Sequence, residues 1–384
     1  MSFETNGEKR TRVLHVLGSL NRGGAETWLI QLMRELSSGI DMDFAVYSEG
    51  PFDFSESVAE LGGRVFSCGS PRFLPLYLAK LNKIIRENGP YDVVHSHLNE
   101  FSGVVLSVAK GCGVPNRIAH SHTQRTNTSG LRMRTWTYPV LRELTALVAT
   151  DRIGCSEGAA ETIFATSLIA GPSQPRVVHC GIDLSHFSHP DPKIRETLRQ
   201  EFGLKDNAFV VGHVGRFTRE KNHSLILDIA ELSVRDSKDV VFVLVGRGPL
   251  LNEVQQQIEA RRLQGSVILA GLRDDVPTLM TSLFDALLFP SLFEGLPIAL
   301  IEAQAAGLPC VLSDGIASDS HILADLVKVV PLDAPLDCWI GALNSFRRFS
   351  RPSDTIGRLS QTDFSIVESA RRMHLAYEHS GVWA

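Results

Sequence analysis

The chain has 384 residues, of which 43% are hydrophobic and 21% are charged, and its formal net charge is -5. This length predicts two domains, each large enough to bury its own core, and the composition is typical of a folded globular protein rather than a disordered one. With 38 basic residues against 43 acidic ones, no excess of positive charge indicates a polyanionic partner, so we expect no nucleic acid partner.

Six cysteines are scattered singly along the chain, and none of them forms a C-x-x-C motif. This spacing indicates neither a zinc cluster nor a disulfide framework, and it is typical of a reducing compartment. The first residues, MSFETNGEKR, lack the apolar core of a signal peptide, and no apolar run reaches the roughly 18 residues that a membrane-spanning helix needs. We therefore expect a cytoplasmic protein, for which peripheral contact with the cytoplasmic face of the inner membrane stays open.

In the first half of the chain, short apolar runs alternate with longer segments of helical periodicity. The runs that we expect to form strands are residues 12–17, 43–47, 64–67, 92–95, 117–121 and 152–155. The expected helices between them include residues 25–36, 74–86, 101–110 and 131–149. Alternation of this kind predicts βαβ units and a parallel sheet.

The same pattern restarts after a polar stretch over residues 183–206. Here the expected strands are residues 208–214, 240–245, 267–270, 286–289 and 310–313, and the expected helices include residues 223–234, 250–262 and 297–306. A continuously apolar run such as VVFVLVG is typical of a strand that is covered on both faces. We therefore expect two α/β domains, over residues 1–185 and 186–359.

The first candidate site is the stretch Gly18-Ser-Leu-Asn-Arg-Gly-Gly-Ala-Glu26, which follows the first expected strand and opens a helix. The adjacent glycines Gly23 and Gly24 would let backbone amides approach a ligand, and a helix N-terminus favours a phosphate. The stretch is not G-x-G-x-x-G, so the dinucleotide-binding fingerprint is missing. It indicates either a phosphate-binding loop or a flexible turn.

The second candidate site is Gly215-Arg-Phe-Thr-Arg-Glu-Lys-Asn222, which follows the first strand of the second domain. Arg216 offers a planar fork of donors and Lys221 a compact charge, and together they could neutralise a diphosphate. A solvated basic turn is the simpler alternative. The position at the carboxyl end of a strand favours a binding site, because open α/β sheets bind their ligands there.

The third candidate site is the stretch from Pro290 to Glu302, PSLFEGLPIALIE. Glu294 falls in a loop and Glu302 in the following helix, so two carboxylates could reach separate hydroxyl groups of one ligand. The backbone amides of Gly295 and Leu296 could face a phosphate. Glu302 could also be an exposed helix residue, but its helix is otherwise apolar and an unpaired buried carboxylate is costly.

Four histidines stand at the ends of two expected strands, His95 and His97 on one, and His120 and His122 on the other. They would converge if these strands are neighbours in the sheet. Metal binding is conceivable, but no carboxylate cluster accompanies the histidines to indicate a particular metal.

Residues 117–142 contain five arginines and no acidic residue, with large apolar side chains interleaved. Such a segment could dock on anionic lipid. A core helix with a basic solvated face is the simpler interpretation.

Taken in order, GGAE, GRFTREKNH, LVGRGPL and FPSLFEGLPIALIEAQAAGLPCV resemble the retaining glycosyltransferases of family 4 (GT4), in particular bacterial exopolysaccharide and capsule glycosyltransferases. The resemblance spans residues 13–314 and extends to a C-terminal crossover helix over about residues 360–384. It implies the GT-B fold, in which two Rossmann-like domains with parallel sheets face each other across a cleft. The first would bind the acceptor and the second the nucleotide-sugar donor.

Carried over by position, the resemblance makes Arg216 and Lys221 ligands of the diphosphate. Glu294 would contact the donor sugar, and Glu302 would contact the ribose. The remaining positions that it implies are Gly23 and Gly24 near the donor phosphate, Arg273 in the base-recognising loop, and His97, Asn99 and His120 on the acceptor side. His122 matches the histidine that lines the reacting centre, with His120 as the alternative. Cys180 replaces an asparagine that is frequent in the family, and we assign it no role.

The implied reaction is hexosyl transfer with retention of configuration, from a UDP-sugar or, next, a GDP-sugar, to a glycan or a lipid-linked acceptor. The cationic side chains would stabilise the departing nucleotide diphosphate, so we expect neither a metal nor another cofactor. A GT-A enzyme would need a D-x-D metal motif, and Asp41-Met-Asp43 stands at the wrong end of a strand for that role. The alternatives are a non-catalytic nucleotide-sugar-binding subunit and a sugar-nucleotide epimerase of the same fold.

Overall fold

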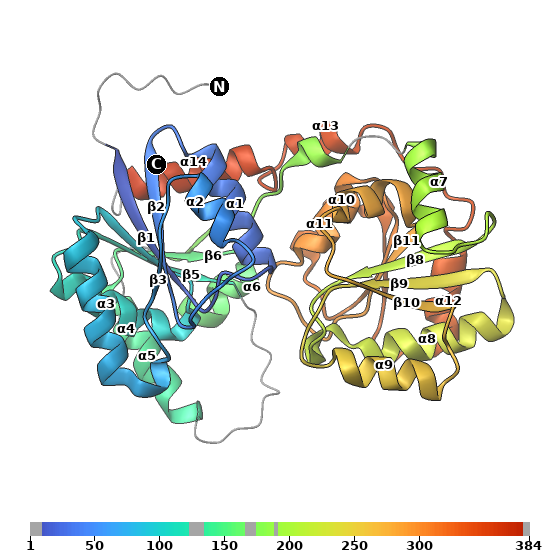
Figure 1. The fold of residues 1–384 in the computed structure, drawn as a ribbon, viewed down its shortest axis with the longest axis horizontal. Coiled ribbons are helices and arrows are strands. Elements are labelled where there is room, and N and C mark those ends of the chain that lie inside the picture. The colour runs from blue at the N-terminus through green and yellow to red at the C-terminus, as the bar shows by residue number, and fades with distance from the viewer. Residues whose placement is uncertain (1–9, 123–133, 166–173, 188–190, 379–384) are drawn as a thin grey trace. The chain divides into compact units, whose positions relative to one another are not determined.

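The computed structural model describes residues 10–122, 134–165, 174–187 and 191–378. The chain forms two compact domains, which are described separately here (Figure 1). The first domain comprises Met1–Gly181 together with the C-terminal segment Asp363–Ala384, and the second comprises Ile182–Thr362.

The first domain is built on a seven-stranded parallel sheet in the order β3-β2-β1-β4-β5-β6-β7. Its strands are β1 (Thr11–Leu17), β2 (Ile40–Val46), β3 (Val65–Ser67), β4 (Val93–Ser96), β5 (Asn116–Ser121), β6 (Asp151–Gly154) and β7 (Arg176–Val177). The strand order reverses direction between β1 and β4, and the edge beyond the carboxyl ends of the strands at such a switch point is where open α/β sheets bind ligands.

Helices cover both faces of this sheet (Figure 1). They are α1 (Gly24–Glu35), α2 (Ser55–Glu60), α3 (Leu74–Asn88), α4 (Ser102–Gly111), α5 (Arg134–Val148), α6 (Glu157–Ala160) and α14 (Ile366–Glu378). Leu14 and Val16 of β1 pack with Tyr77 of α3 and Val105 of α4 in one core. His15 lies on the opposite face, because side chains alternate along a strand, and that face carries α1 and α14.

The second domain has a six-stranded parallel sheet in the order β10-β9-β8-β11-β12-β13. Its strands are β8 (Phe209–Val214), β9 (Val240–Val245), β10 (Val267–Gly271), β11 (Ala286–Phe289), β12 (Cys310–Ser313) and β13 (Val327–Val330). Its helices are α7 (Pro192–Glu201), α8 (His223–Asp236), α9 (Leu251–Ala260), α10 (Val276–Thr278), α11 (Ile298–Ala305), α12 (Leu336–Asn344) and α13 (Thr355–Ser360). The switch point of this sheet lies between β8 and β11.

Several elements are absent from those named in the sequence analysis, among them β7, β13 and α7. Strand β7 has only two residues, and β13 is an edge strand whose VKVV sequence is half exposed, so neither carries a strong periodic signal. Helix α7 lies inside the stretch that we described as polar, for which we named no element. It buries only Leu198 and Arg199, and Asp191 caps its first turn. Among the described residues, no helix is both long and apolar enough to cross a membrane.

Candidate active site

The two motifs of the second domain meet at its switch point. Strands β8 and β11 are hydrogen-bonded neighbours, so the loops that leave their carboxyl ends start side by side. These loops are the GRFTREKN loop (Gly215–Asn222) and the FEGLP loop (Pro290–Pro297). Two hydrogen bonds join them, from the Leu292 amide to the Glu220 carbonyl at 2.8 Å and from Asn222 Nδ2 to the Pro290 carbonyl at 3.2 Å.

Close backbone packing fixes this arrangement. A Cβ atom at Gly246, whose φ is 141°, would lie 2.0 Å from the carbonyl oxygen of Gly215. A Cβ atom at Gly315 would lie 2.3 Å from the carbonyl oxygen of Leu292. Only glycine fits at either position without a shift of one of the two loops.

Lys221 and Glu294 form an ion pair between the two loops. Lys221 Nζ lies 2.6 Å from Glu294 Oε1, and the two side chains are only 15% and 12% exposed. Lys221 Nζ also lies 4.7 Å from the centre of the Phe289 ring. The Arg216 side chain is exposed at the start of the same loop, and it has no hydrogen bond or ion pair to any other described residue.

Glu302 lies on α11, about one turn beyond the start of that helix at Ile298, and is partly buried. Burial raises its pKa to about 7, because the carboxylate has no cationic or hydrogen-bonding partner in the described part of the chain to offset desolvation. Hydroxyl donors of a ligand would supply such partners. The amides of Gly295 and Leu296 likewise donate to no described group, and no side chain caps the first turn of α11.

Arg273 follows β10 and is held by carboxylates. Its guanidinium lies 2.7 Å from Asp275 Oδ2 and 2.5 Å from Glu201 Oε1 on α7. A contact between this side chain and a nucleotide base would compete with these ion pairs. Its role in base recognition stays a prediction.

In the first domain, the glycine loop ends where α1 begins. Gly23 is the N-cap residue in extended conformation, and Gly24 is the first helical residue. Gly23 has no side chain to cap this helix, and the Glu26 carboxylate lies in the first turn beside Gly23.

The four predicted histidines do converge, because β4 and β5 are neighbouring strands. They form two hydrogen-bonded chains, which also include residues that we did not predict. In the first chain, Tyr377 Oη lies 3.0 Å from His95 Nδ1, and His95 Nε2 lies 3.1 Å from His120 Nδ1.

The second chain runs beside the first. His15 Nδ1 lies 3.0 Å from His97 Nε2, His97 Nδ1 lies 2.8 Å from His122 Nε2, and His122 Nδ1 lies 3.8 Å from Cys180 Sγ. The His120 and His122 rings are stacked with their centres 4.1 Å apart. Asn99 supports this end of the sheet, since its Oδ1 accepts a hydrogen bond from the His122 amide at 3.2 Å.

Burial keeps these imidazoles neutral. It lowers the pKa of His15 to about 3 and that of His122 to about 4. Desolvation, followed by repulsion from neighbouring histidines, holds the pKa values of His95, His97 and His120 well below their ordinary value.

Two sets of three histidines bring one ring nitrogen each within 4.8 Å of one another, namely His15 with His95 and His97, and His97 with His120 and His122. Neutral imidazole is a good ligand for zinc, copper or nickel. Most of these nitrogens are already paired with each other by hydrogen bonds, and no carboxylate belongs to either set in the described ranges. That the protein works without a metal stays a prediction.

His15, Tyr377 and Trp28 are the residues of this cluster that sequence reasoning missed. Trp28 of α1 lies edge-on to His120 with ring centres 5.4 Å apart, and its Nε1 donates to Ser369 Oγ at 2.9 Å. His15 pairs with His95 in the register of β1 and β4, so an aligned strand pattern could have found it. No local signal places a tyrosine of the C-terminal helix beside β4.

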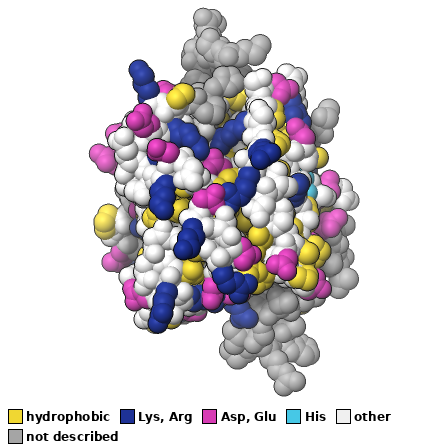
Figure 2. Space-filling view, turned by 90° about the vertical axis from the view of Figure 1, so that its right-hand side faces the viewer, with side chains coloured by type: hydrophobic (Ala, Val, Ile, Leu, Met, Phe, Trp, Pro, Cys, Tyr) yellow, Lys and Arg dark blue, Asp and Glu magenta, His cyan; other side chains and the backbone are white. Residues whose placement is uncertain are grey.

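Positions 123–133 of the basic segment over residues 117–142 lie outside the described residues. At its described ends, Arg117 bonds backbone carbonyls, including that of Val148, and Arg142 bonds the Thr162 carbonyl. On the face shown in Figure 2, basic and acidic side chains are interspersed.

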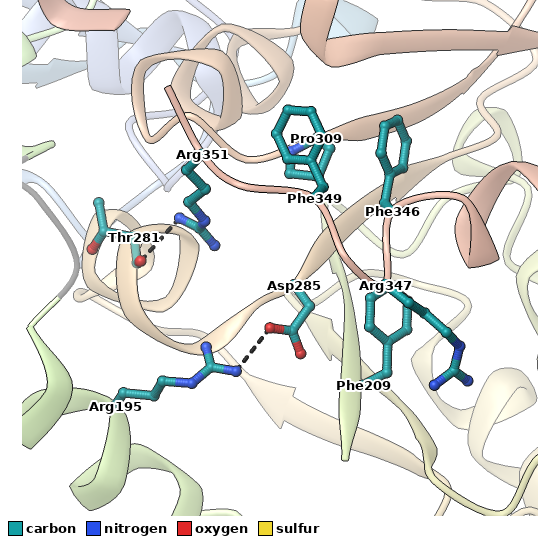
Figure 3. Close-up of a pocket in the computed structure, with 9 residues that line it drawn as sticks. All are labelled: Arg195, Phe209, Thr281, Asp285, Pro309, Phe346, Arg347, Phe349 and Arg351. Atoms are coloured by element: carbon teal, nitrogen blue, oxygen red, sulfur yellow. Dashed lines mark hydrogen bonds and ion pairs between the residues drawn. The ribbon is translucent and has the colours of Figure 1, made fainter. Parts of the chain in front are cut away.

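A pocket in the second domain contains three arginines (Figure 3). It lies at the amino ends of β8, β11 and β12, whereas the GRFTREKN and FEGLP loops follow carboxyl ends of strands. Arg195 pairs with Asp285 at 2.7 Å, and Arg347 pairs with Asp239 at 2.8 Å. Arg351 is partly buried and donates to the carbonyls of Met280, Thr281, Phe284 and Ala306. These arginines bind the ends of helices and strands to one another, so the pocket is structural and separate from the two loops.

Solved structures with this architecture include Anabaena Alr3699/HepE in complex with UDP-glucose, which is 20% identical and has a TM-score of 0.79 over 96% of this chain and 100% of that one. A sucrose-phosphate synthase from Thermosynechococcus elongatus is 17% identical, with a TM-score of 0.74 over 96% of this chain and 98% of that one. The two parallel-sheet domains therefore have the GT-B fold, as the sequence predicts.

Residues 22–186 match the family model described as Glycosyltransferase Family 4, and residues 194–331 match that of Glycosyl transferases group 1. The protein named glycosyltransferase EpsF in Bacillus subtilis (strain 168) is 34% identical over 349 residues, which is 89% of each chain. An Escherichia coli relative, UDP-Gal:alpha-D-GlcNAc-diphosphoundecaprenol alpha-1,3-galactosyltransferase, is 31% identical over 62% of this chain and 61% of its own. The chain belongs to glycosyltransferase family 4, which confirms the predicted resemblance.

Proposed function

We propose that this protein is a retaining hexosyltransferase that uses a UDP-sugar, without a metal ion, to extend a glycan or a lipid-linked acceptor in polysaccharide biosynthesis. The observation that carries the proposal is the meeting of the GRFTREKN and FEGLP loops at one switch point, which brings Lys221 to Glu294. The relatives support the donor and acceptor classes, since one uses UDP-galactose and a diphosphoundecaprenol-linked sugar, and a structure of similar fold holds UDP-glucose.

The proposed chemistry follows from charge. Breaking the bond between the anomeric carbon and the phosphate leaves an anionic nucleotide diphosphate and a sugar with positive character. Arg216 and Lys221 would stabilise the departing diphosphate together with the amides of Gly295 and Leu296. Glu294 would accept hydrogen bonds from the donor sugar rather than attack it.

Glu302 would accept hydrogen bonds from the ribose hydroxyls, which its partly buried and unpaired carboxylate favours. The first domain would bind the acceptor near His97, Asn99 and the ends of β4 and β5. Either His122 or His120 would line the reacting centre.

An exposed apolar patch supports peripheral contact with the cytoplasmic face of the membrane. Phe73, Leu74 and Leu76 at the start of α3 are 69%, 40% and 56% exposed. Arg72 precedes them, and no acidic residue occurs from position 71 to position 86. Apolar side chains beside basic ones suit the interface of an anionic bilayer. The patch would bring the enzyme to an acceptor that carries a lipid.

A flotation assay tests this contact. The protein should float with vesicles that contain anionic phospholipid and remain below with neutral vesicles. The variant Phe73→Ser/Leu76→Ser should lose flotation, whereas Val367→Ser, which removes a 64% exposed side chain from α14, should keep it. Equal flotation of both variants would contradict the assignment of the patch.

The first test of the proposed function is thermal stability with UDP, GDP or ADP, each in EDTA. A nucleotide at one hundred times its dissociation constant should add about 2.7 kcal/mol to the free energy of unfolding. A shift with UDP alone would support metal-independent donor binding and direct transfer assays to UDP-sugars. No shift with any nucleotide would contradict the donor site.

Transfer assays distinguish this function from its alternative, a non-catalytic nucleotide-sugar-binding subunit. Such a subunit would respond to UDP in the thermal assay and neither hydrolyse nor transfer the sugar. The anomeric configuration of the product, read by NMR, tests retention.

A further inference from the structure

A hydrogen-bonded chain joins the C-terminal helix to the end of β5. Tyr377 on α14 reaches His95 on β4, and His95 reaches His120 on β5, with heavy-atom distances of 3.0 Å and 3.1 Å. His95 and His120 are 0% exposed and Tyr377 is 3% exposed. The last atom of the chain, His120 Nε2, is buried and has no hydrogen-bond partner among the described residues.

The chemistry of the three groups gives this chain a direction. A neutral imidazole carries one N–H donor and one lone-pair acceptor. The tautomer of one histidine in a hydrogen-bonded chain therefore determines the tautomer of the next. If the Tyr377 hydroxyl donates to His95 Nδ1, then His95 must donate from Nε2 to His120 Nδ1. His120 then carries its proton on Nε2.

The opposite direction leaves more buried groups unpaired. If His95 Nδ1 donates to the Tyr377 oxygen, the Tyr377 hydroxyl hydrogen has no acceptor among these three residues. His120 then carries its proton on Nδ1, and its Nε2 lone pair is unpaired as well. The first direction leaves one unpaired group and the second leaves two. Because an unpaired buried polar group costs roughly 1–3 kcal/mol, the first direction is favoured.

The protonation states agree with this direction. Burial raises the pKa of Tyr377 well above its ordinary value, so its hydroxyl keeps its proton. Burial also keeps His95 and His120 neutral, so each has a single N–H to place.

His122 differs from His120 in this respect. Its Nε2 is bonded to His97 and its Nδ1 faces Cys180, so both of its ring nitrogens have partners. Of the two histidines at the end of β5, His120 is the one with a ring nitrogen that has no partner among the described residues.

We propose that Tyr377 is a positioning residue whose hydroxyl, relayed by His95, holds His120 as the Nε2–H tautomer. Because Nε2 is buried in this structure, its N–H would donate to a substrate oxygen only after the side chains that cover it shift. This proposal rests on the proposed glycosyl transfer for its functional half. Its structural half, the tautomer of His120, stands without any assumption about the reaction.

Nitrogen-15 NMR of histidine-labelled full-length protein tests the structural half directly. In the wild type, the ring correlations of His95 and His120 should show a protonated Nε2 and an unprotonated Nδ1, with assignments from His95→Gln and His120→Gln. In Tyr377→Phe, His95 Nδ1 loses its donor, and His120 should become a mixture of both tautomers. A wild-type His120 protonated on Nδ1, or a tautomer unchanged in Tyr377→Phe, would overturn the proposal.

Tyr77→Phe is the matched control. Tyr77 is also a buried tyrosine of the first domain, but its hydroxyl has no hydrogen-bond partner in the described part of the chain. Its removal should leave the His120 tautomer and turnover unchanged. Should Tyr377→Phe fail to fold, the wild-type spectrum alone still decides which nitrogen of His120 carries the proton.

Turnover tests the functional half. Tyr377→Phe should lower kcat about tenfold and leave the KM for the donor unchanged, because a misdirected donor acts on the reacting complex rather than on nucleotide binding. A mixed tautomer with normal kcat would overturn the functional half. A protein with no transferase activity at all would refute the proposed function but not the tautomer assignment.

Discussion

Lys221 Nζ and Glu294 Oε1 lie 2.6 Å apart across a separation of 73 residues in the chain. Each side chain is more than four-fifths buried, so each depends on the other to offset its desolvation. A donor diphosphate that binds Lys221 would draw it from Glu294, and the sugar hydroxyls would replace it as partners of the carboxylate. The ion pair therefore holds both groups in place before the donor binds.

From this pair we predict that Lys221→Ala and Glu294→Ala each lower turnover at least tenfold, which corresponds to about 1.4 kcal/mol of transition-state stabilisation. The matched control is Lys328→Ala. Lys328 Nζ also lies over a phenylalanine ring of the second domain, at 4.9 Å from the centre of Phe346, but on β13, away from the two loops. Initial rates with saturating donor check this prediction. Near-normal turnover in both Lys221→Ala and Glu294→Ala would contradict the assignment of these residues to the active site.

Arg216 and Arg219 are exposed arginines of one loop, and we predict that they differ in function. Arg216→Ala should weaken UDP binding about tenfold, because a charge-assisted contact with phosphate is lost and no protein contact is disturbed. Arg219→Ala should bind UDP like the wild type. Isothermal titration with UDP measures both, and an equal loss in the two variants would indicate a general charge effect.

The ionised carboxylate of Glu302 should lower the free energy of unfolding while it favours binding of the donor. Its pKa in the folded protein, about 7, exceeds the ordinary value of 4.5, so folding favours the protonated form. Stability is therefore unaffected below about pH 4.5 and falls as the pH rises from 4.5 to 7, by about 1.4 kcal/mol for each unit of pKa difference.

We accordingly predict that Glu302→Gln raises Tm above pH 7, changes it little at pH 5, and weakens UDP binding. Glu259→Gln, on the exposed face of α9, should change none of these quantities. Thermal melts at both pH values, with and without UDP, provide the measurement. If Glu302→Gln lost stability at pH 8, the carboxylate would have a stabilising partner in solution.

Much of the fold follows from the sequence because parallel strands are apolar runs of characteristic length. The strand expected over residues 240–245 coincides with β9, and that over 310–313 with β12. Some elements that were missed bury little, such as α7 with Leu198 and Arg199. Their stability comes from tertiary contacts, among them Arg195 to Asp285, which no local pattern contains.

The candidate site divides in the same way. The sequence places Arg216, Lys221 and Glu294 at the ends of strands, and the strand order then brings two of them into contact. The histidine cluster could be predicted only in part, because His15 and Tyr377 join it through β1 and α14. A chain of hydrogen bonds depends on which residues meet across elements, and a single sequence holds no signal of that kind.

The buried histidines predict that the protein loses stability in mild acid. Their pKa values in the folded state are depressed, to about 3 for His15 and about 4 for His122, whereas an unfolded histidine titrates near 6.5. Below pH 6.5 the unfolded chain therefore binds protons that the folded chain does not, and each such histidine costs about 1.4 kcal/mol of stability for each pH unit. Stability should be complete above pH 7 and should fall steeply between pH 6.5 and 5, before most carboxylates titrate.

Urea unfolding at pH 7.5, 6.5, 5.8 and 5.0 measures this slope. His15→Phe should reduce it by about one proton, that is by about 1.4 kcal/mol per pH unit, whatever its effect on stability at pH 7.5. His186→Asn, which removes an exposed histidine with 55% side-chain exposure, should leave the slope unchanged. A wild-type free energy of unfolding that stays constant from pH 7.5 to 5.0 would show that the histidines at the ends of β1, β4 and β5 reach solvent, and the neutral hydrogen-bonded chains would then be wrong.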